Sequence, residues 1–413
     1  MASPTAKLSF KEVLAIPSIR RLWIAQLVSV FGDFLAIFAV FSVVTFQLHG
    51  TPTQVSMILV AYLVPLAVLS PLAGVFVDKW NVKWTMILSD VVRGFLVLTL
   101  LFVQHDLRAI YGIFFLLSTV STLFIPAQSV AVRALAPAAG LMAVNALMSQ
   151  AVQGSQIISP ALSGLLVQWL GANSCFLFDS LSFFFSAAMV MSLSIHRQAA
   201  ATAASSVLQS MQQGFRFIFT HSAISFVMIS MTAGMFAVRC FGALLSVYVR
   251  DVLVSNAALF GTLNSLIGFG MIAGTQSLHR FASKVSQQFL VIYGLTGMGL
   301  AVLVTALFGR VVTTALGMLG LGFGAAFIMV PAQTLLQQET PHALLGRVSS
   351  SLMSLLAISQ VLAMFVAGPV DEKAGIRNLY LGSAAMLMTI GAVGYGKLRQ
   401  PKPAKADRAS AGS

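Results

Sequence analysis

The chain carries very little charge for its length. Only 8% of its 413 residues are Asp, Glu, Lys or Arg, whereas 58% are hydrophobic, and its mean hydropathy is +0.92. A soluble domain is roughly one quarter charged, so this composition excludes an ordinary soluble fold and predicts an integral membrane protein. The apolar runs are continuous over about 20 residues, as a membrane-spanning helix requires. A membrane β-barrel would show alternating polarity over shorter segments, so the expected fold is all-α.

Cysteine is nearly absent as well. The two cysteines, Cys175 and Cys240, are too few for a disulfide framework and lack the spacing of a zinc site, so both are expected to be packing residues. The six histidines fall near expected loops or ends of spans and form no paired ligands. No carboxylate dyad lies within one span. The sequence therefore predicts no enzyme, and neither a bound metal nor a cofactor.

Apolar runs between polar breaks predict twelve membrane spans in two groups of six. The expected spans are 20–47, 54–77, 84–104, 108–131, 141–170, 174–195, 222–249, 257–280, 286–308, 311–335, 345–370 and 376–397. The longest polar break separates the two groups. The expected domains are a cytoplasmic N-terminal segment (1–19), an N-terminal six-helix bundle (20–195), a cytoplasmic linker (196–221), a C-terminal six-helix bundle (222–397) and a basic cytoplasmic tail (398–413).

The net charge of +13 is distributed unevenly between the loops. Most of the 24 basic residues lie in the termini and in alternate loops, and the positive-inside rule then places both termini in the cytoplasm. This distribution explains the charge without a nucleic-acid partner, and it makes the lipid bilayer the expected partner. The polar N-terminus shows no cleavable signal peptide, so the first span is expected to direct insertion.

Two short motifs recur at a spacing of about half the chain. Pro-Ala-Gln begins at Pro126 and again at Pro331, 205 residues later, and Leu-Met-Ser begins at Leu147 and again at Leu352, also 205 residues later. A long period of this kind indicates a duplicated unit rather than a solenoid. We therefore expect two halves of similar build, with kinked helices at matching depths.

The loop after the second expected span carries a recognisable motif. It reads GVFVDKWNVKW and resembles the signature of the major facilitator superfamily, in which Gly74, Asp78, Lys79 and Lys83 match the pattern while Asn81 and Val82 depart from it. The superfamily comprises transporters with two six-helix halves related by an axis along the membrane normal. The resemblance implies that this loop acts as a cytoplasmic clasp between helices; a plain basic turn is the alternative.

Further stretches resemble the drug:proton antiporter branch of that superfamily, including macrolide-efflux, siderophore-export and lysophospholipid transporters. They are FIPAQSVAVRALAP, ILSDVVRGFLVL, FLFDSLSFFFSA and, in the second half, TPHALLGRVSSSL, which contains Gly346 and Arg347. The fifth expected span resembles the antiporter signature at Pro160 and Gly164, with Ser159 and Ser163 in place of glycines. These residues are expected to serve in gating, where a kink and close helix packing allow movement.

Several charged residues fall inside the expected spans. Asp90 and Arg93 are three residues apart on one helix face and can form a structural pair or take part in gating. Asp179 lies early in the sixth span and is either a solvated acid at the start of a helix or a proton site. Asp33 lies mid-span, and the repeat offset places it at nearly the depth of Arg239. We expect these two residues to pair across a central cavity, either as a static pair or in proton coupling or substrate contact.

The sequence thus predicts a secondary transporter that exports amphipathic or apolar small molecules by alternating access. Proton antiport is the expected energy source, and Gln128 and Gln333 are expected to face the cavity or bond freed carbonyls. A lysophospholipid flippase or a siderophore exporter of the same fold is the alternative, and a non-transporting receptor or a channel is the alternative from another class. The resemblance implies a monomer in the inner membrane of a bacterium.

Overall fold

A computed structural model describes residues 8–77, 80–195, 221–281 and 285–399 of the chain. In this part of the chain every regular element is helical. The first half contains α1 (Phe10–Ala15), α2 (Pro17–Ser42) with its π-helical extension η1 (Val43–Gln47), α3 (Pro52–Val77), α4 (Val82–Val103), α5 (Leu107–Leu135), the short 3-10 helix η2 (Ala138–Gly140), α6 (Leu141–Leu170) and α7 (Ala172–Met191). The second half contains α9 (Ser222–Asp251), α10 (Ala257–Phe281), α11 (Gln287–Phe308), α12 (Val311–Glu339), α13 (His342–Ala374) and α14 (Ile376–Arg399).

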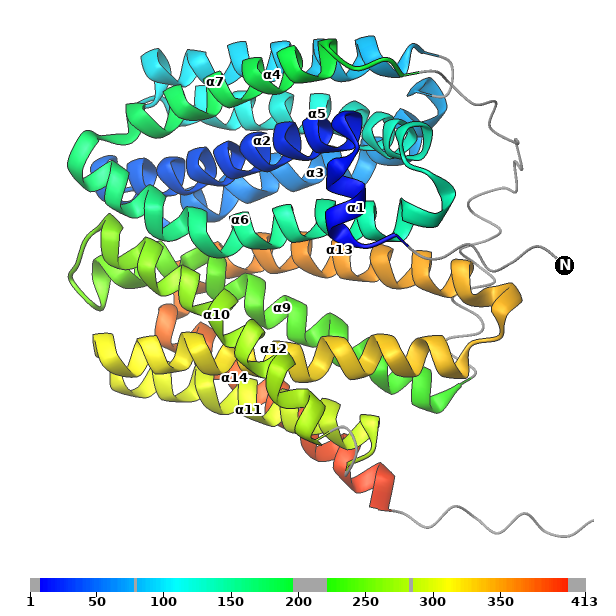
Figure 1. The fold of residues 1–413 in the computed structure, drawn as a ribbon. Helices are drawn as coiled ribbons and strands as arrows, with labels where there is room; N and C mark the ends of the chain where they lie inside the picture. Colours follow the sequence, from blue (N-terminus) through cyan, green and yellow to red (C-terminus); the bar gives the residue numbers. More distant parts are fainter. Residues whose placement is uncertain (1–7, 78–79, 196–220, 282–284, 400–413) are drawn as a thin grey trace, which may run out of the picture.

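The long helices lie side by side in two bundles, stacked one above the other in the view of Figure 1. The first bundle is formed by α2 to α7 and the second by α9 to α14, and α6 packs on α10 while α3 packs on α13 across the boundary. We call the end of the molecule that carries α1 the α1 end, and the end that carries the loop between η1 and α3 the Gly50 end. The six-plus-six division predicted from the sequence is confirmed.

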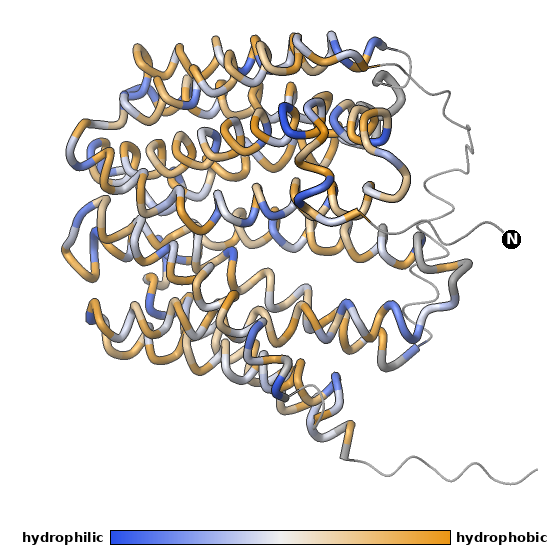
Figure 2. The backbone as a smooth tube through the Cα atoms, in the orientation of Figure 1, coloured by the Kyte–Doolittle hydropathy of each residue, from blue (hydrophilic) through white to orange (hydrophobic). Residues whose placement is uncertain are grey.

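Eleven helices in the described part of the chain are long and apolar enough to cross a membrane, and α6 is not among them. The helices are hydrophobic over most of their length, and polar residues are more frequent near their ends (Figure 2). The remaining expected span, α6, is 30 residues long but rich in Ser and Gln. Two of its serines donate hydrogen bonds to α2, Ser159 to the carbonyl of Phe31 at 3.3 Å and Ser163 to that of Leu35 at 2.9 Å. Because α6 packs between α2 and α10, these two buried serines bond to protein rather than face lipid.

Part of the N-terminal segment, expected over residues 1–19, forms the short helix α1. Ser9 caps α1, its hydroxyl accepting from the backbone N–H of Glu12, while the Glu12 carboxylate accepts from the backbone N–H of Ser9 at 2.7 Å. These hydrogen bonds lower the pKa of Glu12. Val13 is buried, and the backbone N–H of Leu8 bonds to the carbonyl of Ala139, so α1 closes over the end of the first bundle. The first span, α2, then begins at Pro17 rather than at residue 20.

Candidate functional site: an intramembrane charge cluster in the first half

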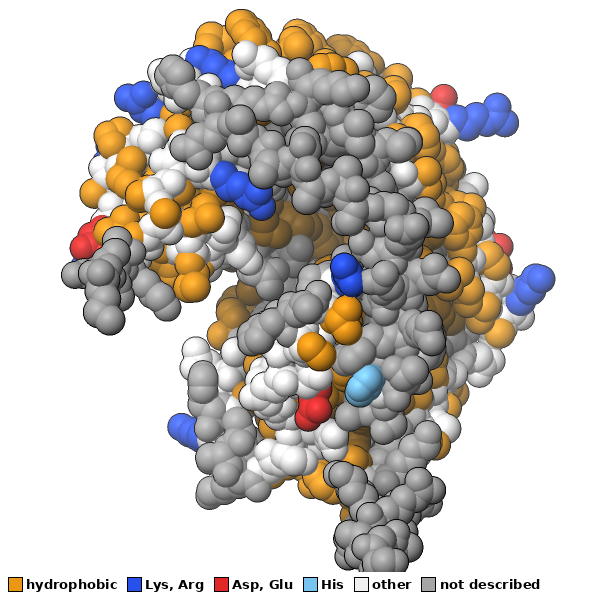
Figure 3. Space-filling model, turned by 90° about the vertical axis from the view of Figure 1, so that its right-hand side faces the viewer, with side chains coloured by type: hydrophobic (Ala, Val, Ile, Leu, Met, Phe, Trp, Pro, Cys, Tyr) orange, Lys and Arg blue, Asp and Glu red, His pale blue; other side chains and the backbone are white. Residues whose placement is uncertain are grey.

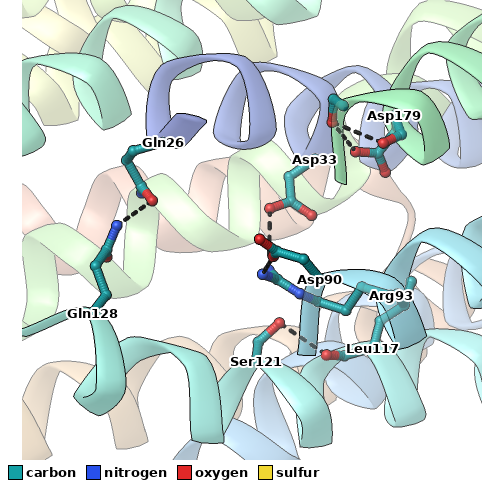
Figure 4. A network of polar contacts seen from close by, with 9 residues as sticks. Gln26, Asp33, Asp90, Arg93, Leu117, Ser121, Gln128 and Asp179 are labelled. Carbon is teal, nitrogen blue, oxygen red and sulfur yellow. Dashed lines mark hydrogen bonds and ion pairs between the residues drawn. The ribbon is translucent and has the colours of Figure 1, made fainter. Parts of the chain in front are cut away.

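Arg93 is the centre of a charge cluster in the first half. Asp90 and Arg93 lie one turn apart on α4, and both are buried. The guanidinium forms an ion pair and hydrogen bond with the Asp90 carboxylate (Figure 4). The ring centroids of Phe124 and Phe183 each lie 4.4 Å from the Arg93 guanidinium carbon. Two rings and a carboxylate therefore hold the cation inside the bundle, as a planar guanidinium allows.

Asp33 on α2 is the second acid that contacts Arg93. Its Oδ2 lies 3.9 Å from Nη1 of Arg93, and its side chain is 27% exposed, whereas that of Asp90 is fully buried. Arg93 therefore bridges an accessible carboxylate and a buried one. The two acids differ in access to water although they share one cation, so a proton can reach Asp33 without disturbing Asp90.

Asp179 on α7 completes the cluster (Figure 4). It is buried, which contradicts the predicted solvated acid at the start of a helix, because α7 packs closely on α2 at this level. Gly32 makes that approach possible: a Cβ at residue 32 would lie 2.5 Å from Oγ of Ser182 and 2.6 Å from Oδ1 of Asp179. Three carboxylates thus lie in one cluster with a single guanidinium, which contacts Asp33 and Asp90. Because one cation balances only one carboxylate in a water-poor interior, the cluster has carboxylates available to hold protons.

The predicted pair between Asp33 and Arg239 is not formed in this conformation. Among the described residues, the ion pair of Asp33 joins it to Arg93. Arg239 is half-buried on α9, and its Nε has no hydrogen-bond partner among the described groups. A Cβ at Gly242, three residues further along α9, would meet open space. Arg93 lies close to Asp33 because α4 and α2 belong to the same bundle.

The two glutamines that were expected near the cavity have different surroundings. Gln128 on α5 donates a hydrogen bond to Gln26 on α2 (Figure 4), so it connects two helices of the first half. Its repeat equivalent Gln333 is exposed on α12 and lines a small cavity of about 200 Å³ together with Gln337, Ser349, Leu352 and Met353. The prolines of the repeat, Pro126 and Pro331, both lie inside unbroken helices.

The expected gating residues lie in three places. Pro160 and Gly164 of α6 face α10. A Cβ at Gly164 would lie 2.5 Å from the carbonyl oxygen of Ala257, and a Cβ at Gly261 would lie 2.0 Å from the carbonyl oxygen of Pro160. Gly74 lies in α3 and Lys83 is half-buried in the first turn of α4, while Asp78 and Lys79 lie outside the described residues. Gly346 and Arg347 lie in the first two turns of α13.

The contacts between the halves are concentrated toward the Gly50 end. The α6–α10 contact extends from Gly164 and Gly261 to Gly268, whose Cβ position lies against Ile157 near the middle of the helices. At the Gly50 end, Thr45 donates a hydrogen bond to Ser246 at 2.8 Å, and Glu372 accepts one from the Thr53 N–H at 3.2 Å. At the opposite end the surface is hollowed between the halves (Figure 3). The structure is therefore open at the α1 end and closed at the Gly50 end.

Comparison with protein families identifies the chain. The model of the family described as transmembrane secretion effector, MFS_3, matches residues 11–412. The chain belongs to this family of major facilitator superfamily transporters. It is 25% identical over 385 residues to the uncharacterized MFS-type transporter YfiS of Bacillus subtilis, covering 89% of this chain and 90% of that protein. It is 21% identical to macrolide efflux protein A of Streptococcus pyogenes, over 90% of this chain and 94% of that protein.

Solved structures support the same fold. The crystal structure of the nucleoside transporter NupG superposes with a TM-score of 0.75 at 13% identity, covering 93% of this chain and all of that one. A bacterial homologue of the human lysosomal transporter Spinster, in an inward-facing and unoccupied conformation, gives 0.70 at 10% identity, over 92% and 96% of the two chains. The protein is thus a multi-pass membrane transporter of small molecules and not an enzyme, as the sequence predicted, and the receptor and channel alternatives are set aside.

The sequence did not reveal the residues that organise the cluster. Phe124 and Phe183 were two phenylalanines among 31, with no local pattern to distinguish them. Gly32 offered a usable signal, because a glycine beside an intramembrane acid indicates a close helix approach.

Proposed function

We propose that the protein exports amphipathic or apolar organic molecules by alternating access, driven by proton antiport in which Asp33 exchanges the proton. It acts as a monomer in the inner membrane of a bacterium, with both termini in the cytoplasm. In that orientation the α1 end is cytoplasmic, and the present conformation faces inward. Coupling then requires a group that binds protons from one side of the membrane and releases them to the other.

The observation that carries this proposal is that the two acids that contact Arg93 differ in their exposure. Asp33 is 27% exposed while Asp90 is fully buried, so Asp90 can keep the cation in place while Asp33 gains or loses a proton. The Arg93–Asp33 separation of 3.9 Å is loose compared with a direct charge-assisted hydrogen bond. A weakly held, accessible carboxylate beside a fixed cation suits reversible protonation.

The substrate class rests on similarity and on the apolar surroundings of the cluster. Macrolide efflux protein A matches this chain over 90% of its length. Phe31 and Phe178, which are close in sequence to Asp33 and Asp179, meet edge-on at 5.9 Å. On α9, Met235 and Phe236 are partly buried against the core. Aromatic and methionine side chains accommodate apolar ligands of varied shape.

The test is transport in proteoliposomes under an imposed pH gradient, with the cationic amphipathic dye Hoechst 33342 as the probe. We expect wild-type protein to move the dye only when a gradient is present, and Asp33→Asn to lose gradient-driven movement by about tenfold or more, because an amide cannot carry the proton. The matched control is Asp106→Asn. Asp106 is an exposed acid that caps α5 by accepting from the Arg108 N–H at 2.9 Å, and asparagine caps equally well.

Three results would count against the proposal in different ways. Gradient-driven dye movement by Asp33→Asn at the wild-type rate would overturn the role of Asp33. Movement by the wild type without any gradient would overturn antiport. If the wild type moves no dye but flips fluorescent lysophosphatidylethanolamine between leaflets, the flippase alternative replaces drug export.

A further inference from the structure

Arg250, the penultimate residue of α9, contacts the main chain of the opposite half at the Gly50 end. Its Nη1 donates hydrogen bonds to the carbonyl oxygens of Thr45 at 3.0 Å and Gly50 at 2.8 Å. The same guanidinium forms a two-point interaction with its neighbour Asp251, from Nε at 2.6 Å and from Nη2 at 2.9 Å. One side chain thus joins α9 of the second half to the end of η1 in the first.

The carbonyls of Thr45 and Gly50 are available to Arg250 because α2 and its extension η1 end irregularly. The π-helical segment η1 follows α2 directly and ends at Gln47, and His49 then adopts a positive φ of 50°. The Gly50 N–H, which would continue the π-helical pattern by bonding to Thr45, bonds instead to the Val44 carbonyl at 2.8 Å. Carbonyls at the end of a helix need donors from elsewhere, and Arg250 supplies them from the other half.

Asp251 fixes the direction of the guanidinium. The side chain of Arg250 is 18% exposed and that of Asp251 49% exposed, so the pair lies at the margin of the closed end. With Nε and Nη2 engaged by Asp251, Nη1 is left to point at the opposite half, which a flexible ammonium group would not do. Beneath it the bond between Thr45 and Ser246 is fully buried, so Arg250 covers a dry contact.

The repeat places this contact at the axis that relates the halves. The separation between Thr45 and Arg250 is 205 residues, the same offset that relates the two Pro-Ala-Gln motifs. Residues in equivalent positions of two halves contact each other only where they lie close to the pseudo-two-fold axis. The contact therefore lies where the end of η1 and the end of α9 must separate if the Gly50 end opens.

We propose that Arg250 is the latch of the Gly50 end, a positioning residue that holds this end shut by binding the Thr45 and Gly50 carbonyls and releases them in the alternate conformation. The proposal rests on the alternating access proposed above. Because the acceptors are main-chain atoms, no substitution in the first half can remove them, so the strength of the latch is set by Arg250 and Asp251.

The experiment uses spin-label distances at both ends of the full-length protein in lipid nanodiscs. One pair is placed at Gln47→Cys and Val254→Cys, two exposed positions on opposite halves of the Gly50 end; the other is placed at Arg133→Cys and Gln338→Cys, exposed repeat equivalents at the ends of α5 and α12. Cys175 and Cys240, both buried and free, are replaced by alanine. Arg250→Gln is expected to raise the population with a longer 47–254 distance about tenfold, since hydrogen bonds to a charged group are lost, and to shorten the 133–338 distance in the same population.

Two further variants separate the latch from general damage. Asp251→Asn should give an intermediate shift at both pairs, because Arg250 keeps its charge but loses its orientation. Arg108→Gln, which removes an exposed arginine at the same end, should change neither pair. Unchanged distances in Arg250→Gln while low pH or Asp33→Asn still shifts them would overturn the latch alone. If no variant or pH shifts either pair, alternating access fails and the latch fails with it.

Discussion

At the scale of single residues, Arg93 shows why an arginine and not a lysine occupies the middle of α4. Its guanidinium pairs with Asp90, lies 3.9 Å from Asp33, and has the centroids of two aromatic rings 4.4 Å away. An ammonium group could pair with one acid but could not stack between two rings at the same time. The side chain therefore combines charge neutralisation with packing.

Removing this cation should destabilise the protein strongly. Arg93→Leu leaves Asp90 buried without a partner, and breaking one side of a buried pair reduces the free energy of unfolding by about 3–5 kcal/mol. The measurement is thermal unfolding of the protein in detergent. Combining Arg93→Leu with Asp90→Asn should recover much of the lost stability, because no uncompensated buried charge of that pair remains. A double variant no more stable than Arg93→Leu would show that the Asp90–Arg93 pair is not the source of the effect.

Spacing along one helix predicted the Asp90–Arg93 pair, but nothing local predicted the partner of Asp33. Residues three apart on a helix share a face whatever surrounds them. The choice of Asp33 between Arg93 and Arg239 depends on how α2 is rotated against α4 and on which end of the molecule is closed. The sequence predicted which charges lie inside the spans, and tertiary packing decided which of them meet.

At the scale of elements, α6 is the helix that apolar content describes least well. Among the described helices it is not apolar enough to count as a membrane span, because Ser and Gln residues recur along its length. Its length and its place in the repeat predicted it correctly, while its partner helices could not be read from the sequence. The serines that replace two expected glycines, Ser159 and Ser163, bond to α2 carbonyls and so have a packing role of their own.

The close approach of α6 to α10 gives a prediction with an internal control. Gly164→Ala places a Cβ 2.5 Å from the Ala257 carbonyl oxygen, so the helices must separate, and overpacking of this kind reduces stability by about 1–3 kcal/mol. Gly154→Ala, on the same helix, meets open space and should be neutral or slightly stabilising, because alanine favours helix. Thermal unfolding of both variants checks the contrast, and equal melting temperatures would mean that the two halves do not pack here as described.

At the scale of the whole molecule, the repeat predicted two halves but not their conformation. The repeat of 205 residues predicts the fold of each half. Because each half keeps its fold in both conformations, the repeat cannot distinguish a molecule open at the α1 end from one open at the Gly50 end. What distinguishes them is a small set of contacts across the boundary, among them Thr45–Ser246 and Arg250–Gly50. Such contacts join residues some 200 positions apart and leave no periodic pattern in the sequence.

The orientation in the membrane is the remaining prediction, and it follows from charge. Arg20, Arg21, Lys83 and Arg133 lie at the α1 end, and the positive-inside rule places that end in the cytoplasm. Val254→Cys, whose native side chain is 84% exposed in the α9–α10 loop, should then react with a membrane-impermeant maleimide in intact cells. Ala138→Cys, exposed in η2 at the α1 end, should react only after permeabilisation, both in the background without native cysteines. The reverse pattern would place the Arg250 contact in the cytoplasm and make the present conformation outward-facing, so that substrate would enter the open end from outside.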